Sequence, residues 1–330
     1  MQKFLLFAIL GLLLSSLFSA EAEIENIRFE NDNGRVIITY DLISEEPVNI
    51  IVKAVRGDDF IVPGAIAGNI IDVQPGLDKQ IWWEPYLEQL NPEDWTIELS
   101  VWSGDYVFVQ GSDINFEDNS TVSIKAFYVG TYEVTQKDWC EVMDSNPAKF
   151  ENPENPVENV RWDQVIEFCN IKSKNEGLTP CYEVFPDSVK CYFNADGYRL
   201  PYEVEWEYCA SGGVLSNLYS YSGSKDVDEV AWYDEMSDHA PSIPGQLSPN
   251  ELGIYDMSGN VEEWCWDNYL KDRSKPVYDV RKSRVMAEKV IKGGSWFANY
   301  KKCKIEARSG ESPDTRDFRI GFRLFRTAQK

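Results

Sequence analysis

The sequence predicts an exported protein with two domains, an all-β domain followed by a larger α+β domain. Three observations support this: an N-terminal targeting segment, a run of short strand patterns up to residue 103, and a change of texture after Ser103-Gly104. Beyond that point cysteines, clustered tryptophans and helical patterns begin. A chain of 330 residues, 43% of them hydrophobic, is long enough to bury a core in each domain.

The first 22 residues have the pattern of a signal peptide. Lys3 precedes the apolar run FLLFAILGLLL, and Ala20-Glu21-Ala22 supplies the small residues of a cleavage site. We expect the mature chain to begin near Glu23. No later segment is apolar for long enough to cross a bilayer, so we expect no transmembrane segment and a periplasmic or extracellular location.

Residues 23–104 read as strands throughout. VIITYDL, VNIIVKAV, KQIWWEP and WTIELSVW alternate or run apolar, and Asn-Gly and Pro-Gly pairs mark the turns between them. Short strands without helical periodicity predict a small β-sandwich, similar to immunoglobulin-like or fibronectin-like modules. A spacer or adhesive role is the expectation for this domain.

The rest of the chain, residues 105–330, contains three helical patterns separated by long loops. Thr135 can cap a helix over QKDWCEVM, WDQVIEFCNIKSKNEG has an apolar inner face that ends at Gly177, and EVEWEYCASGG ends at two glycines. Loops of this length are usually functional or held by ions and aromatic packing. The pattern predicts an α+β domain with little regular secondary structure.

Charge and histidine content exclude several classes of function. The chain has 32 Lys and Arg against 55 Asp and Glu, a formal charge of −23, which repels phosphate backbones and excludes nucleic acid as a partner. Divalent cations and basic peptides suit this field, which also keeps an exported protein soluble. His239 is the only histidine, so multi-histidine zinc and iron sites are excluded.

The seven cysteines leave their pairing open. Seven is an odd number, so at least one thiol is free, metal-bound or paired between molecules. Cys181 and Cys191 flank a turn in CYEVFPDSVKC, and a disulfide across this hairpin is one hypothesis. The alternative for these and the other thiols is that they are small buried hydrophobic side chains.

Five segments resemble the formylglycine-generating-enzyme, or sulfatase-modifying-factor, domain, over roughly residues 105–327. The segments are FYVGTYEVTQKDW, NPVENVRW, GYRLPYEVEWEY, ELGIYDMSGNVEEWCWD, and KGGSW with ARSGESPD and IGFR. The resemblance implies a C-type-lectin-like α+β fold, preceded here by the small β-sandwich. Members of this family share a scaffold, but some are copper oxidases and others only bind a ligand.

The resemblance implies that the copper enzymes of the family oxidise a substrate cysteine to formylglycine with copper that two cysteines hold. Here Ala298 stands at the first cysteine position, and Cys303 at the second when counted from the glycines; the stretch to Arg308 is shorter than in the enzymes. A single thiolate holds Cu(I) poorly, although Cys209 or Cys265 could supply a second ligand. We therefore expect no copper site and a structural Cys303. The alternative is a divergent formylglycine-generating oxidase with Cys303 as its catalytic residue.

A calcium site is the second implication of the resemblance. It places one Ca²⁺ among the carboxylates of Asp256 and Glu263 and the backbone carbonyls of Gly259 and Val261. Ca²⁺ prefers several oxygen ligands, and a Ser-Gly-Asn turn can direct carbonyls toward two neighbouring carboxylates. Such an ion would also hold a loop that has little regular structure.

The expected ligand-binding surface lies in the 292–309 stretch. We predict that Ser295, Trp296, Asn299 and Arg308 contact a peptide or protein ligand. Arg308 and Arg323 either form the floor of the family's cleft or brace the C-terminal strand by pairing with carboxylates. The leading prediction is a calcium-stabilised binding module; a third possibility is an adhesive protein whose active part is the β-sandwich.

The carboxylates of Glu203, Glu205 and Glu207 follow Tyr202, which stands where the family usually has a threonine helix cap. Tyrosine cannot cap in that way, which costs on the order of 1 kcal/mol. Three carboxylates could form a catalytic cluster. We expect instead a capping and solvated helix face.

Overall fold

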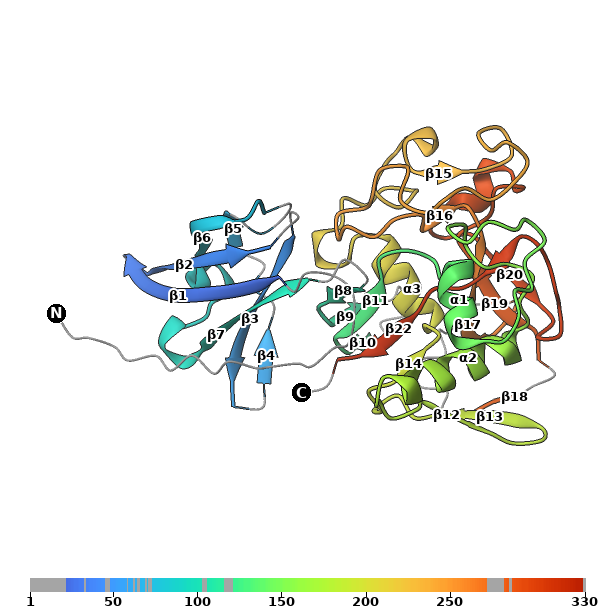
Figure 1. Cartoon of the computed structure of the whole chain (residues 1–330), viewed down its shortest axis with the longest axis horizontal. Helices are drawn as coiled ribbons and strands as arrows, with labels where there is room; N and C mark the ends of the chain where they lie inside the picture. The colour runs from blue at the N-terminus through green and yellow to red at the C-terminus, as the bar shows by residue number, and fades with distance from the viewer. Residues whose placement is uncertain are drawn as a thin grey trace. The chain divides into compact units, whose positions relative to one another are not determined.

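A computed structural model describes residues 22–328, except positions 33, 45–47, 58, 62, 64–65, 69, 71–72, 103–105, 116–120, 272–281 and 285–286. Residues 1–21 of the predicted signal peptide lie outside the described residues. The chain divides into two compact units, residues 1–105 and 106–329, and the predicted domain boundary after residue 104 falls beside this division (Figure 1). No helix in the described ranges is both long enough and apolar enough to cross a membrane.

The first unit contains two antiparallel sheets of four and three strands. The larger has the order β1-β2-β6-β5 and the smaller β4-β3-β7. The strands are β1 (Glu23–Asp32), β2 (Arg35–Ile43), β3 (Asn49–Arg56), β4 (Asp59–Ile61), β5 (Ile66–Gly68), β6 (Gly76–Trp83) and β7 (Thr96–Trp102). The prediction of a small all-β sandwich is confirmed.

Alternation along the strands of the first unit creates its core. On β2, Val36, Ile38 and Tyr40 are buried, while Ile37 and Thr39 between them are partly exposed. The core takes side chains from both sheets: Val36, Ile38, Tyr40, Leu42, Ile50, Val52, Ala54, Val73, Ile81, Trp83, Trp95 and Ile97. Since successive side chains of a strand point to opposite faces, the period-2 pattern fixes which face each sheet turns to the other.

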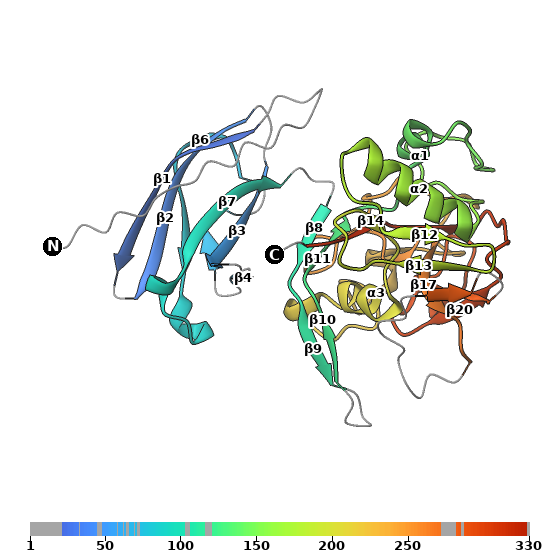
Figure 2. The ribbon, with the colours of Figure 1, turned by 90° about the horizontal axis from the view of Figure 1, so that it is seen from below.

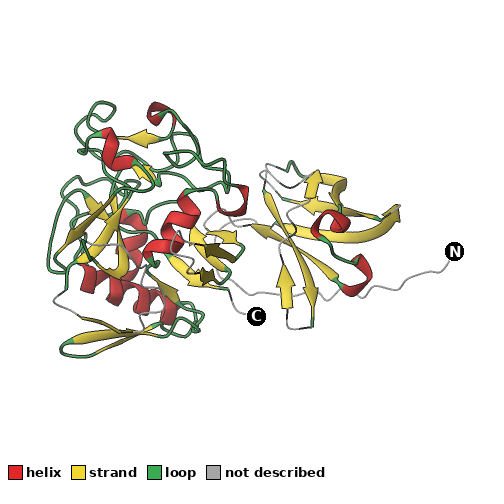
Figure 3. Cartoon of the chain, turned by 180° about the vertical axis from the view of Figure 1, so that it is seen from behind, coloured by secondary structure: helices red, strands yellow, loops and turns green. Residues whose placement is uncertain are grey.

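Loops dominate the second unit (Figure 3). Its described strands form five small sheets. The sheet that joins its two ends has the order β14-β22-β11-β8, and a second four-stranded sheet has the order β20-β19-β17-β21. These strands are β8 (Tyr106–Val109), β11 (Phe127–Gly130), β14 (Tyr198–Arg199), β17 (Glu262–Asn268), β19 (Lys289–Lys292), β20 (Arg308–Glu311), β21 (Ile320–Gly321) and β22 (Phe325–Thr327).

The remaining sheets of the second unit have two or three strands, in the orders β12-β13-β18, β10-β9 and β15-β16. Their strands are β9 (Ser112–Asn115), β10 (Thr121–Ile124), β12 (Tyr182–Val184), β13 (Ser188–Cys191), β15 (Ala231–Trp232), β16 (Ser258–Gly259) and β18 (Lys282–Arg284). Short 3-10 helices lie at Pro85–Glu88 and Pro92–Asp94 in the first unit, and at Gly213–Leu215, Val227–Glu229 and Tyr300–Cys303 in the second.

All three predicted helices are confirmed: α1 (Gln136–Val142), α2 (Trp162–Asn175) and α3 (Glu203–Ala210). Thr135 caps α1, because its Oγ1 accepts the amide of Asp138 at 3.1 Å and the Asp138 carboxylate accepts the amide of Thr135. Helix α2 ends before Gly177, whose φ of 73° favours glycine. Figure 2 shows α2 alongside β14.

The structure contradicts the hypothesis of a disulfide between Cys181 and Cys191. All seven cysteines, each of them within the described residues, are free. Cys181 lies just before β12 and its thiol donates to the carbonyl of Gly197 at 3.2 Å, while Cys191 ends β13 opposite Tyr182. Both thiols are buried, and so the alternative of small buried hydrophobic side chains describes them.

Candidate functional site

A buried ion pair occupies the centre of the second unit. Arg323 follows β21, and its guanidinium donates from Nε and Nη2 to Glu263 Oε1 on β17, at 3.0 and 2.8 Å. The other Glu263 oxygen accepts from the indole nitrogen of Trp206 at 2.6 Å. Arg323 also donates to the carbonyls of Gly130, Thr131 and Tyr255, which satisfies its remaining donors.

Two more buried carboxylates, those of Glu133 and Asp256, interact electrostatically with Arg323. Glu133 accepts from the Asn260 amide group at 2.6 Å and from the Val261 backbone at 3.0 Å. Burial, together with the negative charges of Asp256 and Glu263, raises the pKa of Glu133 well above its ordinary value. Burial also raises the pKa of Asp256 to about 6. Three carboxylates therefore face one guanidinium, an arrangement that favours another proton or cation.

The predicted calcium ligands all lie in this region. Asp256 Oδ2 accepts the amide of Gly245 at 2.7 Å, whereas Asp256 Oδ1 is buried without a hydrogen-bond partner. An unpaired buried oxygen of this kind fits a missing cation partner. Among the described residues no three His, Cys, Asp or Glu side chains form a metal cluster. A site here would therefore depend on the carbonyls of Gly259 and Val261 as well as on Asp256 and Glu263.

The predicted solvated face of α3 is wrong. Its three carboxylates form ion pairs with cations that lie outside the helix: Glu203 with Arg308, Glu205 with Arg199, and Glu207 with Lys292, at 2.6, 2.7 and 2.7 Å. Glu203 and Glu205 are buried. The sequence places the carboxylates on one helix but contains no local signal for partners that lie 6 to 105 positions away.

The helix start explains how Tyr202 stands in the family's capping position. Its side chain makes no capping hydrogen bond, as predicted. Glu205 Oε2 accepts the backbone amide of Tyr202 at 2.8 Å, while the Tyr202 ring stacks on Phe193 with centroids 4.2 Å apart. The tyrosine therefore contributes packing where a threonine would contribute a hydrogen bond.

Cys303 is enclosed in the protein interior. It ends the 3-10 helix Tyr300–Cys303 and is fully buried against Tyr221, Val230, Ala231 and Tyr233. Burial, together with the nearby carboxylates of Glu262 and Asp234, raises the pKa of its thiol to about 12. No second cysteine belongs to this described cluster, in which Cys209 and Cys265 take no part. The thiol is therefore protonated at neutral pH and shielded from solvent.

The glycines before Cys303 allow the loop to fold back on itself. Gly294 has a φ of 72°, and a Cβ at this position would lie 2.8 Å from the carbonyl carbon of Lys302 and 2.9 Å from the Cys303 amide nitrogen. Ala298 closes the intervening turn, because its amide donates to the Ser295 carbonyl at 2.8 Å and its own carbonyl accepts from Asp234 at 3.0 Å. The backbone of this loop is therefore held in place.

The predicted ligand surface is only partly at the surface. Ser295 and Trp296 are buried, and their contact with a ligand stays a prediction. Asn299 is exposed and caps the following 3-10 helix by accepting the amide of Lys301. Arg308 donates twice to Glu203, at 2.6 and 2.9 Å, and once to the Leu270 carbonyl, as the brace interpretation expects.

An aromatic cluster surrounds Trp296 and reaches the surface. The Trp296 ring contacts Phe150, Phe297 and Phe318 with centroids 5.2, 5.4 and 5.7 Å apart. Phe297 is 55% exposed, and Lys149 Nζ lies 4.0 Å from the centre of the Phe318 ring. The sequence did not predict a role for Phe150 and Phe318, because residues from three distant segments meet here and no motif links them.

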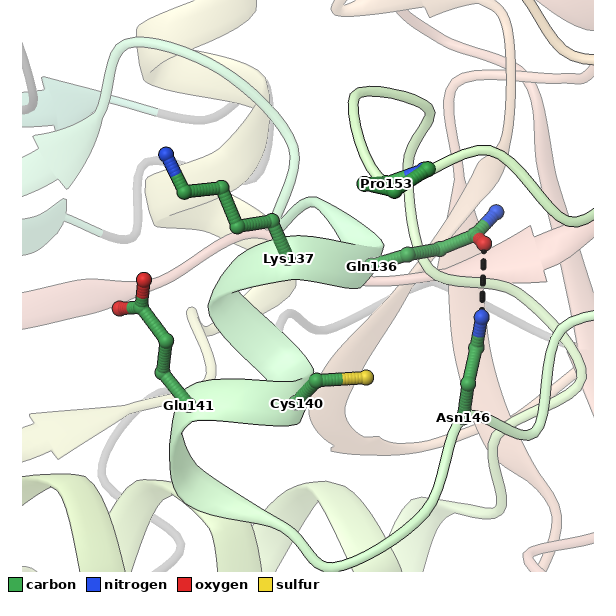
Figure 4. A pocket seen from close by; sticks show the side chains of 6 residues that line it. All are labelled: Gln136, Lys137, Cys140, Glu141, Asn146 and Pro153. Carbon is green, nitrogen blue, oxygen red and sulfur yellow. Dashed lines mark hydrogen bonds between the residues drawn. The ribbon is translucent and has the colours of Figure 1, made fainter.

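A second feature that the sequence did not predict is an open pocket of about 330 Å³ beside α1. Figure 4 shows the Cys140 thiol pointing between Gln136 and Asn146, which are joined by a hydrogen bond of 2.9 Å. Lys137 extends away from the thiol. Cys140 is the one exposed thiol of the seven, all of which are described.

Together these features define a class: a C-type-lectin-like domain, held by buried ion pairs, whose glycine-rich loop contains a single enclosed thiol. Residues 91–328 match the family described as sulfatase-modifying factor enzyme 1-like domain. The chain is 38% identical over 239 residues to the chaperone protein LppX of Paenibacillus barcinonensis, 62% of this chain and 82% of that protein. This chain belongs to the sulfatase-modifying factor family.

Two further relatives show how the family varies. The formylglycine-generating enzyme of Streptomyces coelicolor is 29% identical over 166 residues, which cover 44% of this chain and about half, 51%, of the enzyme. Treponema denticola variable protein 1 superimposes with a TM-score of 0.59 at 31% identity, over 68% of this chain and 94% of that one. The match to the family model begins at residue 91, inside the first compact unit.

Proposed function

We propose that this protein is an exported binding module for a peptide or protein, built on the sulfatase-modifying-factor scaffold without its copper chemistry. The single observation that supports this most strongly is the enclosure of Cys303, a fully buried thiol with a raised pKa and Ala298 at the position of its partner. Copper in such a site needs thiolates, and burial keeps this thiol protonated.

The relatives also support a binding role. The name of the LppX protein describes a chaperone, a class that acts by contacting other proteins, and it has the higher identity and coverage of the two curated relatives reported above. Loops held by a rigid core are also a common way for proteins to present a binding surface. The ordered loop 295–303 with exposed Phe297 and Asn299 has this character.

A copper assay tests this proposal against the oxidase alternative. The reduced mature protein is incubated with Cu(I) and a Cys-x-Pro-x-Arg peptide, and the peptide is followed by mass spectrometry, with Cys303→Ser as the control. We expect an unmodified peptide and no stoichiometric copper. Conversion to the aldehyde by the wild type, lost in the control, would replace the binding proposal by the oxidase.

We also propose calcium as a stabilising ion in this module. All the proposed ligands are oxygen atoms, the type that Ca²⁺ prefers. They are the Asp256 Oδ1, which has no hydrogen-bond partner, the carbonyls of Gly259 and Val261, and the carboxylate of Glu263. Glu263 would share its charge with Arg323, so Asp256 would be the principal carboxylate. When bound, the ion would neutralise buried charge and hold the loop.

Thermal unfolding with and without chelator tests the calcium proposal. Saturating calcium should stabilise the wild type, by about 2–3 kcal/mol at a concentration a hundred times the dissociation constant. The Asp256→Asn variant should unfold at the same temperature in both conditions. An identical melting temperature for the wild type with calcium and with chelator would remove calcium from the proposal.

A further inference from the structure

The surface around the aromatic cluster differs in charge from the rest of the molecule. We call it the aromatic–basic face and define it by six side chains: Lys149, Phe150, Phe297, Lys301, Lys302 and Phe318. Four of them, all except Phe150 and Phe318, are exposed, and these two rings are half-buried. The chain as a whole has a formal charge of −23, whereas three of these six side chains are exposed lysines, of which Lys149 lies over the Phe150 and Phe318 rings.

The rings of this face are fixed in position. Phe150 and Phe318 lie 6.2 Å apart, Phe297 and Phe318 6.3 Å apart, and Trp296 supports all three from beneath. The Trp296 carbonyl accepts the Ser237 hydroxyl at 2.7 Å, which holds the backbone next to Phe297. Rigid, partly exposed aromatic side chains are the usual anchors of protein interfaces, since little entropy is lost when a partner covers them.

The lysines of this face are available to a partner. In the described part of the chain, Lys149, Lys301 and Lys302 form no ion pair with a carboxylate, whereas the neighbouring Arg319 is paired with Asp317 at 2.6 Å. Lys149 rests on the Phe318 ring, and Lys302 donates to the Ser309 hydroxyl at 3.3 Å. Carboxylates lie near these lysines without an ion pair: Lys149 interacts electrostatically with Asp317 and Glu158, and Lys302 with Glu262.

Local charge decides what such a face attracts. At physiological ionic strength the Debye length is about 8 Å, so a docking segment responds to the nearest lysines more than to the net charge of the chain. The face ends at Asp234, whose backbone amide donates to the Ala298 carbonyl at 3.0 Å. The lysines therefore attract acidic side chains of a partner, whereas Asp234 repels acidic side chains that lie next to it.

We propose that the aromatic–basic face binds a partner protein through an acidic segment with an aromatic or aliphatic anchor residue. The anchor packs against Phe150, Phe297 and Phe318, and the neighbouring carboxylates contact Lys149, Lys301 and Lys302. This inference rests on the proposed binding function and specifies its partner. The net negative charge of the chain alone would favour a basic peptide, whereas this face favours an acidic one. The charge of the bound peptide therefore distinguishes the two expectations.

The test is a selection of phage-displayed random peptides on the full mature protein, followed by titration of the enriched peptides. We expect enrichment of Asp and Glu beside Phe, Trp or Leu. Phe297→Ala and Lys149→Glu should each weaken binding about 10-fold or more. Phe185→Ala, an exposed ring on the β12–β13 hairpin, and Lys174→Glu, an exposed lysine on α2, are matched controls that should bind like the wild type.

Each other outcome of the selection overturns the inference. Peptides that bind both face variants as tightly as the wild type would leave the proposed binding function standing but place its site elsewhere. Enrichment of basic peptides would refute the acidic partner. Failure to enrich any peptide would count against both the face and the proposed function. Circular dichroism of each variant separates lost binding from lost folding.

Discussion

The ion pairs of α3 and β17 and the loop 295–303 belong to the same unit but use their residues in opposite ways. Around α3 and β17, charged side chains are buried and every carboxylate of the helix has a cation partner. In the loop, the thiol at the position expected for chemistry is enclosed while aromatic and basic side chains are exposed. Buried ion pairs therefore hold this scaffold together with its apolar core, while aromatic and basic side chains of the loop remain at the surface.

The largest expected effect comes from removing the central cation. Arg323→Met leaves the carboxylates of Glu263, Glu133 and Asp256 buried together without a guanidinium, and we expect a loss of about 3–5 kcal/mol in the free energy of unfolding. Urea denaturation at neutral pH measures this. Arg316→Met, at an exposed arginine, is the matched control and should change stability by less than about 0.5 kcal/mol.

Equal effects of the two arginine substitutions would end the distinction between a charged core and a free surface. A double variant, Arg323→Met with Glu263→Gln, sharpens it. Removal of one negative charge should restore part of the stability that Arg323→Met loses, because fewer carboxylates remain unpaired. A double variant less stable than Arg323→Met would mean that hydrogen bonding, and not charge, dominates the pair.

A pH dependence is the second largest expected effect. Burial raises the pKa of Asp267 on β17 to about 8, above its ordinary value of 3.8, so the folded protein binds a proton that the unfolded chain releases. The stability that this bound proton contributes is complete below the pKa of Asp267 in the unfolded chain, 3.8. It is lost as the pH rises toward and through the pKa in the folded protein, about 8. Between about pH 5 and pH 7 we expect Asp267 to contribute a loss of about 1 kcal/mol per pH unit.

The matched variant for this dependence is Asp267→Asn. An asparagine oxygen can still accept the Glu203 amide, which Asp267 Oδ2 accepts at 2.7 Å, but it does not titrate. We expect the slope of unfolding free energy against pH to be shallower in the variant than in the wild type. Equal slopes would show that Asp267 is ionised in the folded protein across this range.

The smallest effect is expected at the exposed part of the loop. Phe297→Ala removes a ring that is 55% exposed, and we expect the free energy of unfolding to change by less than about 0.5 kcal/mol, while binding weakens as proposed above. Thermal denaturation measures the first quantity. A large loss of stability would assign Phe297 to the core with Trp296 and weaken the contrast between the two regions.

Local patterns predicted much of this architecture. Period-2 alternation identified the strands of the first unit, and the cap at Thr135 with the inner face of α2 identified two helices. The sequence order of five segments indicated the family. The site was less predictable: Trp296, which we expect to contact a ligand, is buried beside Phe150 and Phe318. Contacts between distant segments leave no periodic trace.

The sequence by itself determined that position 298 is alanine, that only one histidine is present, and therefore which metal chemistries lack their ligands. Tertiary structure alone decided the partners of the charges: Glu203, Glu205 and Glu207 follow one another on α3, but burial requires a cation for each, supplied by Arg308, Arg199 and Lys292. Composition limits which groups exist, whereas desolvation and distance, which only the folded chain sets, decide what each group can do.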